Sequence, residues 1–181
     1  LELQTVLEDL VSAGKIRWYG WSTDIADNAH KFAPGQHCTS IQFRLNAIYD
    51  HPEMRRVCAD FDLAGINKDP LNKGILTGKF NSGSTFPEND IRSRANFSDP
   101  EMVKRLKVVD EIRDILTSNG RTMAQGALAY IWALDARMVP IPGFKSVQQV
   151  RENAGALQFG ALSEAQVRDV QALVAKYELK G

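Results

Sequence analysis

The stretch MVPIPGFKSVQQVRENAGAL, residues 138–157, contains a complete strand, turn and helix. The apolar run from Met138 to Ile141 predicts a short strand, and Pro142 with Gly143 predicts the turn after it. The helix that follows has an apolar face, because its apolar residues recur at intervals of three, four and three: Val147, Val150, Ala154 and Leu157. Such a unit is the building block of α/β folds.

A cation and a polar cap stand at the start of this helix. Ser146 occupies the N-cap position and Lys145 precedes it. Unpaired amides and the helix dipole favour an anion here, so the pattern predicts an anion site. Gln149, Glu152 and Asn153 share one helical face, where their side chains are able to contact the edge of a purine. The pattern alone leaves a second interpretation open, a capped surface helix with an exposed lysine.

The alternation of strands and helices runs through the rest of the chain. The hydrophobic patterns predict strands at 16–21, 39–43, 63–67 and 138–141. They predict helices at 1–13, 24–32, 52–61, 100–118, 122–134, 147–157 and 163–177. Residues 81–99 are rich in Ser, Asn, Asp and Gly and predict a long mobile loop. This order favours an α/β fold with a parallel sheet.

Individual residues mark the predicted helix ends. Gly14 closes the first helix, Thr23 or Asp24 caps the second, and Ser163 with Gln166 forms a capping box at the last. The tryptophans are expected to be core aromatics: Trp18, Trp21 and Trp132.

The composition is that of a globular protein. Of 181 residues, 44% are hydrophobic and 24% charged, and the formal net charge is zero. This balance implies no basic face, so nucleic acid is not an expected partner. No apolar run approaches about 18 residues, and no signal peptide is visible, so we expect no membrane partner and a cytoplasmic location. Cys38, at the start of a buried strand, and Cys58, on a core-facing helix position, indicate neither a disulfide framework nor a metal site.

Several motifs, taken in order, resemble those of the aldo-keto reductases, above all the bacterial and potassium-channel-β-like branches. They are GKIRWYGWS at 14–22, SIQFRLNAIYD at 40–50, DPLNKGILTGKF at 69–80, TMAQGALAYIWA at 122–133, and IPG with QxxEN within 141–153. The resemblance covers nearly the whole chain, and several ordered motifs are far more specific than any one of them.

This resemblance implies a fold. The family forms a (β/α)8 TIM barrel, and such a barrel typically takes about 250 residues. The four predicted strands look like strands five to eight of that barrel, so residues 1–181 are expected to be one domain, the C-terminal half of the barrel.

The resemblance also implies NADPH as cofactor. Ser22 and Gln42 match positions that hydrogen-bond the nicotinamide carboxamide, and Lys145 matches the grip on the adenosine 2′-phosphate. Lys68 departs from the family's stacking Tyr or Trp, and is either close to a phosphate or turned to solvent. The full expected cofactor-binding set is Ser22, Gln42, Lys68, Pro70, Leu71, Thr77, Lys79, Gly143, Lys145, Gln149, Glu152 and Asn153.

Residue chemistry supports part of this set independently of the resemblance. Gly74 and Gly78 allow the backbone between them to approach a ligand closely. Thr77 and Lys79 offer a hydroxyl and a charge to a pyrophosphate, although GxxTGK is a weak signal and not the P-loop spacing. Arg92 and Arg94 are able to reach a phosphate if the long loop folds over, and a solvated loop is the alternative for them.

No catalytic residue is predicted. The family's Tyr, Lys, Asp and His come from the first four strands, and this sequence begins after them. None of the tyrosines matches the catalytic position: Tyr19, Tyr49, Tyr130 and Tyr177. The histidines are expected to have surface or structural roles: His30, His37 and His51.

The leading hypothesis is therefore an NADPH-dependent oxidoreductase that reduces aldehydes or ketones, represented by its cofactor-binding half and inactive alone. Its partner in the full-length parent is a small carbonyl substrate. The alternative is a non-catalytic half-barrel or a nucleotide-sensing interaction subunit; another (β/α)8 enzyme with phosphate-binding loops is a weaker third. Unpaired edges at 16–21 and 138–141 also predict self-association.

Overall fold

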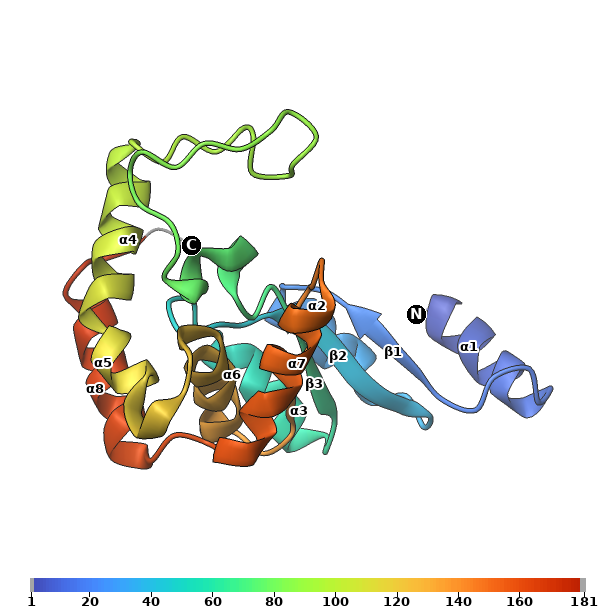
Figure 1. The fold of residues 1–181 in the computed structure, drawn as a ribbon. Coiled ribbons are helices and arrows are strands. Elements are labelled where there is room, and N and C mark those ends of the chain that lie inside the picture. The colour runs from blue at the N-terminus through green and yellow to red at the C-terminus, as the bar shows by residue number, and fades with distance from the viewer. Residues whose placement is uncertain (1, 180–181) are drawn as a thin grey trace.

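The computed structural model describes residues 2–179, so Leu1, the predicted start of the first helix, lies outside the described part. Figure 1 shows the course of the chain. The strands are β1 (Tyr19–Ser22), β2 (Cys38–Arg44), β3 (Ala64–Lys68) and β4 (Met138–Pro140). The α-helices are α1 (Glu2–Ser12), α2 (Ala26–Phe32), α3 (Pro52–Asp60), α4 (Pro100–Glu111), α5 (Arg113–Leu116), α6 (Met123–Leu134), α7 (Val147–Gly155) and α8 (Glu164–Ala175). The 3-10 helices are η1 (Asn72–Thr77), η2 (Ser118–Gly120) and η3 (Ala156–Phe159).

The strands form one parallel sheet in the order β1-β2-β3-β4. Ser22 at the end of β1 lies opposite Gln42, and Arg44 at the end of β2 lies opposite Lys68. The predicted α/β fold with a parallel sheet is therefore confirmed. The carboxyl ends of all strands meet at one edge of the sheet, where α/β proteins place their ligand sites.

Helices pack against one face of the sheet. On β2, Ile41 and Phe43 are fully buried, whereas the alternate residues Ser40, Gln42 and Arg44 are only partly buried. Side chains alternate across a strand, so one face lies in the core and the other is more open. The helix α3 packs against β2 and β3, and α6, which contributes eight buried residues, packs against β4.

Most local predictions hold. Ser163 and Gln166 form the expected capping box, and Cys38 and Cys58 are buried at the expected strand and helix positions. The cap predicted for the second helix is wrong. That helix begins at Ala26, because the Asp24 carboxylate instead accepts the Arg44 amide at 2.7 Å and pairs with Lys68 at 2.7 Å.

Other helix boundaries also differ. The predicted helix 100–118 is broken at Ile112 into α4 and α5. Ile112 and Leu116 are both fully buried, so the apolar stripe continues across the break and could not reveal it. The helix predicted to reach Leu157 ends at Gly155 and continues as η3. Trp18, expected in the core, is 60% exposed and precedes β1, which begins only at Tyr19.

Residues 81–99 contain no helix or strand, yet the segment is fastened to the body. In Figure 1 it arches away from the sheet between η1 and α4. Phe80, Phe86 and Phe97 form an aromatic cluster with ring centroids 5.1 to 5.7 Å apart. Phe97 is buried. The mobility of this loop stays a prediction, but this aromatic cluster packs the two ends of the loop together.

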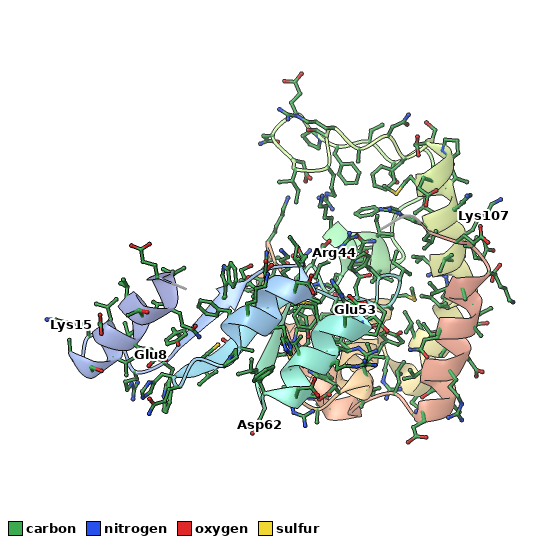
Figure 2. The ribbon with its side chains drawn as sticks, turned by 180° about the vertical axis from the view of Figure 1, so that it is seen from behind. Glu8, Lys15, Arg44, Glu53, Asp62 and Lys107 are labelled. Atoms are coloured by element: carbon green, nitrogen blue, oxygen red, sulfur yellow. The ribbon has the colours of Figure 1, made fainter. Side chains whose placement is uncertain are left out.

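The helix α1 lies beyond β1, far from α4 and α8 (Figures 1 and 2). None of its residues is buried. Within residues 2–179, no helix combines the length and apolar character needed to cross a membrane.

Candidate cofactor site

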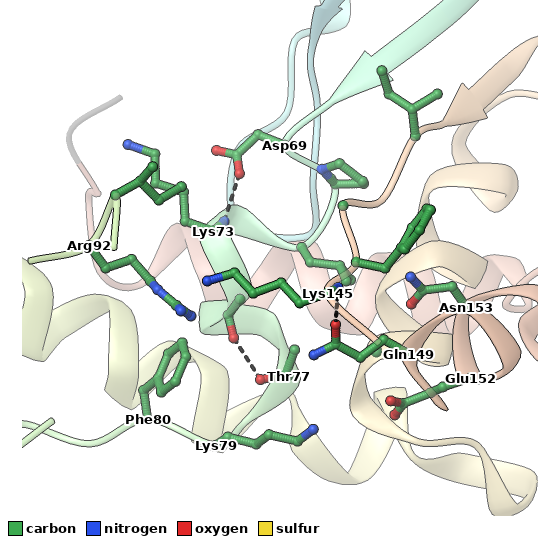
Figure 3. Close-up of a pocket in the computed structure, with 18 of the residues that line it drawn as sticks. Asp69, Lys73, Thr77, Lys79, Phe80, Arg92, Lys145, Gln149, Glu152 and Asn153 are labelled. Atoms are coloured by element: carbon green, nitrogen blue, oxygen red, sulfur yellow. Dashed lines mark hydrogen bonds between the residues drawn. The ribbon is translucent and has the colours of Figure 1, made fainter. Parts of the chain in front are cut away.

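One cavity of about 540 Å³ lies at the carboxyl ends of β3 and β4. Two segments form most of its wall: residues 69–80, which follow β3, and residues 141–153, which follow β4. A third wall comes from residues 90–92 of the long loop, which reach the cavity from the other side (Figure 3). Its size is within the range of small-molecule sites, about 300–1,000 Å³.

The segment after β3 is a tight turn in an unusual backbone conformation. Asp69, Asn72, Lys73 and Gly74 all have positive φ. The Asp69 carboxylate accepts the Lys73 amide at 2.7 Å and so holds the turn closed. At Gly74, with φ of 92°, a Cβ would stand 3.1 Å from the Phe80 ring. Glycine is therefore required where this turn approaches the aromatic wall.

The segment after β4 presents the start of α7 to the cavity. The Ser146 hydroxyl accepts the Gln149 amide at 3.2 Å, which confirms the predicted N-cap. The Gln149 side-chain oxygen in turn accepts the Lys145 amide at 2.6 Å. These two bonds fix the turn, and the Lys145 side chain remains 74% exposed.

Asp90 connects the long loop to this turn. Its carboxylate accepts the Arg92 guanidinium at 2.6 and 2.7 Å and lies 3.0 Å from the Lys145 ammonium. Arg92, and to a smaller extent Lys145, hold the pKa of Asp90 well below its usual range. The Arg92 guanidinium also lies 4.2 Å from the centre of the Phe86 ring and 5.1 Å from that of Phe80. The loop is thus fixed over the cavity by charge and by cation–π contacts.

The cavity combines cations with apolar walls. Four cationic side chains line it: Lys73, Lys79, Arg92 and Lys145. Three carboxylate side chains also line it: Asp69, Asp90 and Glu152. The apolar wall consists of Pro70, Leu71, Phe80, Ala124, Ile91, Ile141 and Phe144. Cations around a helix N-terminus suit phosphate groups, and the apolar surfaces suit a flat ring.

Comparison with known proteins decides the family. The pattern of the Aldo/keto reductase family matches residues 1–175. The chain belongs to the aldo/keto reductase family. Its sequence is 31% identical over 186 residues to the aldo-keto reductase yakc of Schizosaccharomyces pombe, whose name specifies NADP(+). That alignment covers 99% of this chain and 54% of the relative.

Other members of the family agree. A pyridoxal reductase of Arabidopsis thaliana is 31% identical over 129 residues, covering 71% of this chain and 34% of that protein. The glycerol dehydrogenase of Gluconobacter oxydans has the same fold, with a TM-score of 0.78 at 24% identity over 97% of this chain and 54% of that one. An aldo/keto reductase of Klebsiella pneumoniae, solved with NADP and acetate, gives 0.65 at 24% identity over 95% and 54%. The chain spans about half the length of these aldo-keto reductases or less.

Nine of the twelve predicted cofactor-binding residues line the cavity of this aldo-keto reductase chain: Pro70, Leu71, Thr77, Lys79, Gly143, Lys145, Gln149, Glu152 and Asn153. In two of them, a polar atom of the side chain is already hydrogen-bonded within the protein. The Thr77 hydroxyl donates to the Gly74 carbonyl at 2.7 Å, so only its lone pairs remain free. The Gln149 oxygen holds the Lys145 amide, which leaves the NH₂ group for a ligand.

Three predicted residues do not line this cavity. Ser22 and Gln42 lie opposite each other at the ends of β1 and β2. The Lys68 ammonium pairs with the Asp24 carboxylate at 2.7 Å, and the Lys68 side chain is 38% exposed. Its approach to a phosphate stays a prediction. Burial raises the pKa of Asp24, but Lys68 and the Arg44 amide outweigh it and lower that pKa overall.

The sequence missed several lining residues. Lys73 lies inside the DPLNKG motif, so the motif could have suggested it. No sequence pattern indicates Asp90 or Phe144 as lining residues. Asp90 lies in a polar loop without periodicity, and Phe144 lies in a turn. Arg92 reaches the cavity as suggested, whereas Arg94 is not among the lining residues.

The histidines have structural contacts. The His37 ring lies 2.6 Å from the Glu8 carboxylate, and the His51 ring lies 2.9 Å from the Asp24 carbonyl. His30 packs edge-on against Phe61. The part of the chain that the structure describes contains no group of three or more His, Cys, Asp or Glu side chains placed to hold a metal ion.

Proposed function

We propose that this chain is the cofactor-holding part of an NADPH-dependent reductase of aldehydes and ketones. In this proposal its sheet is one half of a (β/α)8 barrel, with β1 to β4 as strands five to eight. Four parallel strands in sequential order support the proposal, since a barrel of this type has eight. The coverage of about half of each relative supports it as well.

The observation that carries the proposal is Lys145 at the mouth of the cavity. Its exposed side chain stands just before the N-terminus of α7. Residues 69–80, 90–92 and 141–153 meet around it in the wall of the cavity. An adenosine 2′-phosphate fits this position by charge. The Asp90 carboxylate holds the same ammonium at 3.0 Å, so a bound phosphate would compete with Asp90 for Lys145.

The remaining lining residues fit the rest of the cofactor. Lys79 and Arg92 would neutralise the pyrophosphate, and the Gln149 NH₂ group with Asn153 would contact the adenine edge. Ser22 and Gln42, at the ends of β1 and β2, would hold the nicotinamide carboxamide outside this cavity. When bound, NADPH supplies the hydride that reduces a carbonyl carbon.

These residues bind and orient, but none is proposed to donate the proton that the carbonyl oxygen needs. General acid catalysis is typically worth about 10²–10⁴-fold. We therefore expect the 181-residue chain to bind NADPH without oxidising it in the presence of aldehydes. The full-length parent is expected to carry the activity and to take a small carbonyl substrate.

The test makes two measurements on the purified chain. A titration with NADPH detects saturable binding, and the absorbance of NADPH over time, with and without a panel of aldehydes, detects its oxidation. Saturable binding with no loss of absorbance is the expected result. Absence of saturable binding would contradict the cofactor-holding role. Turnover by the pure chain would mean that it contains the proton donor.

A further inference from the structure

The turn after β3 has a backbone conformation that needs support. Four of its residues have positive φ, between 47° and 92°: Asp69, Asn72, Lys73 and Gly74. Only glycine adopts such values readily, and other residues keep them where the surrounding structure holds them in place. Asp69, Lys73 and Gly74 line the cavity, so the contacts that hold this turn also shape one wall of the cavity.

Arg44, at the end of β2, reaches this turn with its side chain (labelled in Figure 2). Its Nε atom lies 3.6 Å from the Asp69 carboxylate, and its Nη2 atom donates to the Asn72 side-chain oxygen at 3.4 Å. The Tyr49 ring covers the guanidinium, whose Cζ atom lies 4.3 Å from the ring centre. One guanidinium thus contacts two of the four residues with positive φ, and the ring restrains it on the other side.

The Asp69 carboxylate connects Arg44 to the backbone of the turn. One carboxylate oxygen faces Arg44, and the other accepts the Lys73 amide at 2.7 Å. The Asp69 carbonyl is held as well, because it accepts the side-chain amide of Asn46 at 3.1 Å. Asn46 is fully buried, and its side-chain oxygen accepts the Ile48 amide at 3.2 Å. Asp69 is therefore fixed at both its carboxylate and its carbonyl by residues that end or follow β2.

The turn lies beside a cation assigned above to the pyrophosphate. A Cβ atom on Gly74 would stand 3.4 Å from the Arg92 guanidinium. Lys73 and Arg92 both line the cavity, whereas Arg44 and Asn46 do not. The contacts that begin at Arg44 thus lead to the place where the cations of the cavity gather, although Arg44 itself stays outside the cavity.

We propose that Arg44 is a positioning residue for the cofactor. Through Asp69 and Asn72 it holds residues 69–74 in the shape that receives the pyrophosphate, and it does not touch the cofactor. This inference rests on the proposed function, which supplies the identity of the ligand. The contacts of the Arg44 side chain lie between the ends of β2 and β3, the two inner strands of the described sheet, so they involve neither edge of that sheet. Loss of Arg44 should weaken binding of the whole cofactor and spare binding of its adenosine 2′-phosphate part.

The test measures two affinities of the protein by calorimetry, for NADPH and for adenosine 2′-monophosphate, which has no pyrophosphate. Arg44→Met keeps the length of the side chain and removes its charge and its donors. It should weaken NADPH binding at least about tenfold, because a wall that is displaced no longer fits the ligand. It should change the affinity for adenosine 2′-monophosphate less than about threefold. Arg56→Met, at an exposed arginine of α3, is the matched control and should change neither affinity.

Hydrogen exchange adds a measurement that needs no ligand. In Arg44→Met the Lys73 amide, which donates to Asp69, should exchange faster than in the unmodified protein. The Gly65 amide, which donates to the Arg137 carbonyl at 3.0 Å, should exchange at the same rate and so report an intact sheet. Arg44→Lys is the conservative variant. Its ammonium is able to reach Asp69 but not Asn72 as well, so it should lose less NADPH affinity than Arg44→Met.

Unchanged NADPH affinity in Arg44→Met would overturn the proposal. Equal losses for NADPH and adenosine 2′-monophosphate would overturn it too, because they would show a general structural role. If Arg44→Met failed to fold, equal losses for the two ligands in Arg44→Lys would have the same meaning. If the unmodified protein bound no NADPH, the proposed function would be wrong and this inference with it, which is a result distinct from the others.

Discussion

At the scale of single residues, the account depends most on Lys145. Its ammonium is exposed and has one carboxylate, that of Asp90, at 3.0 Å. Replacing it with Glu removes a charge-assisted contact with the 2′-phosphate and places a like charge there. Lys145→Glu should therefore weaken NADPH binding by about 1–3 kcal/mol. Lys107→Glu, an identical charge change at an exposed residue of α4 that does not line the cavity (labelled in Figure 2), should leave the affinity unchanged. If both variants lost the same affinity for NADPH, the cause would be the change in overall charge and not a contact with Lys145.

The sequence predicts polar residues well where local geometry decides their contacts. The Ser146 cap depends only on the residues next to it, and it is present. Asp24 shows the opposite case, because its partners Arg44 and Lys68 come from other strands. The place of Asp90 at the cavity could not be predicted for the same reason: its nearest partner, Arg92, is two positions away, but Lys145, its other partner, is 55 positions away. Contacts between distant segments require the fold, and a single sequence does not contain their geometry.

At the scale of elements, α1 depends on Glu8. This carboxylate accepts the Tyr19 hydroxyl and the His37 amide, the latter at 3.1 Å, and lies 2.6 Å from the His37 ring. These bonds tie α1 to the starts of β1 and β2, while no residue of α1 is buried. The Tyr19 hydroxyl, and then His37, lower the pKa of Glu8 from 4.5 to about 2. The ionised carboxylate is therefore the form that holds the helix.

We expect Glu8→Gln to reduce the hydrogen-exchange protection of α1 at neutral pH. Because the folded-state pKa is depressed, the contribution of Glu8 to stability is present above about pH 4.5 and is lost as pH falls toward about 2. The stability difference between the native chain and the variant should shrink over that window. Asp9→Asn, at an exposed position on the same helix, is the control for removing one carboxylate charge from α1. A difference that stays constant from pH 5 to 2 would exclude this role.

Hydrophobic periodicity predicts where the helices lie along the chain, but not what covers their apolar sides. The pattern predicts an apolar stripe over residues 147–157, yet Val147 on α7 and Leu157 in η3 are exposed. Periodicity reports which side of a helix is apolar, and it cannot report whether a partner is present. The break between α4 and α5 could not be predicted for a related reason, because the apolar stripe continues through Ile112.

At the scale of the whole molecule, strand–helix alternation was enough to predict the parallel sheet. The cavity was predictable in outline, because parallel strands bring residues 69–80 and 141–153 to one edge. Its third wall was not, because the loop at 81–99 has no periodic pattern.

The most direct test of the central claim is the ratio of NADPH to NADH affinity, measured by calorimetry on the unmodified chain. The two cofactors differ only in the 2′-phosphate, which is the group assigned to Lys145. The account predicts that NADPH binds at least about tenfold more tightly, as expected for one charge-assisted contact. Equal affinities for NADPH and NADH would contradict it.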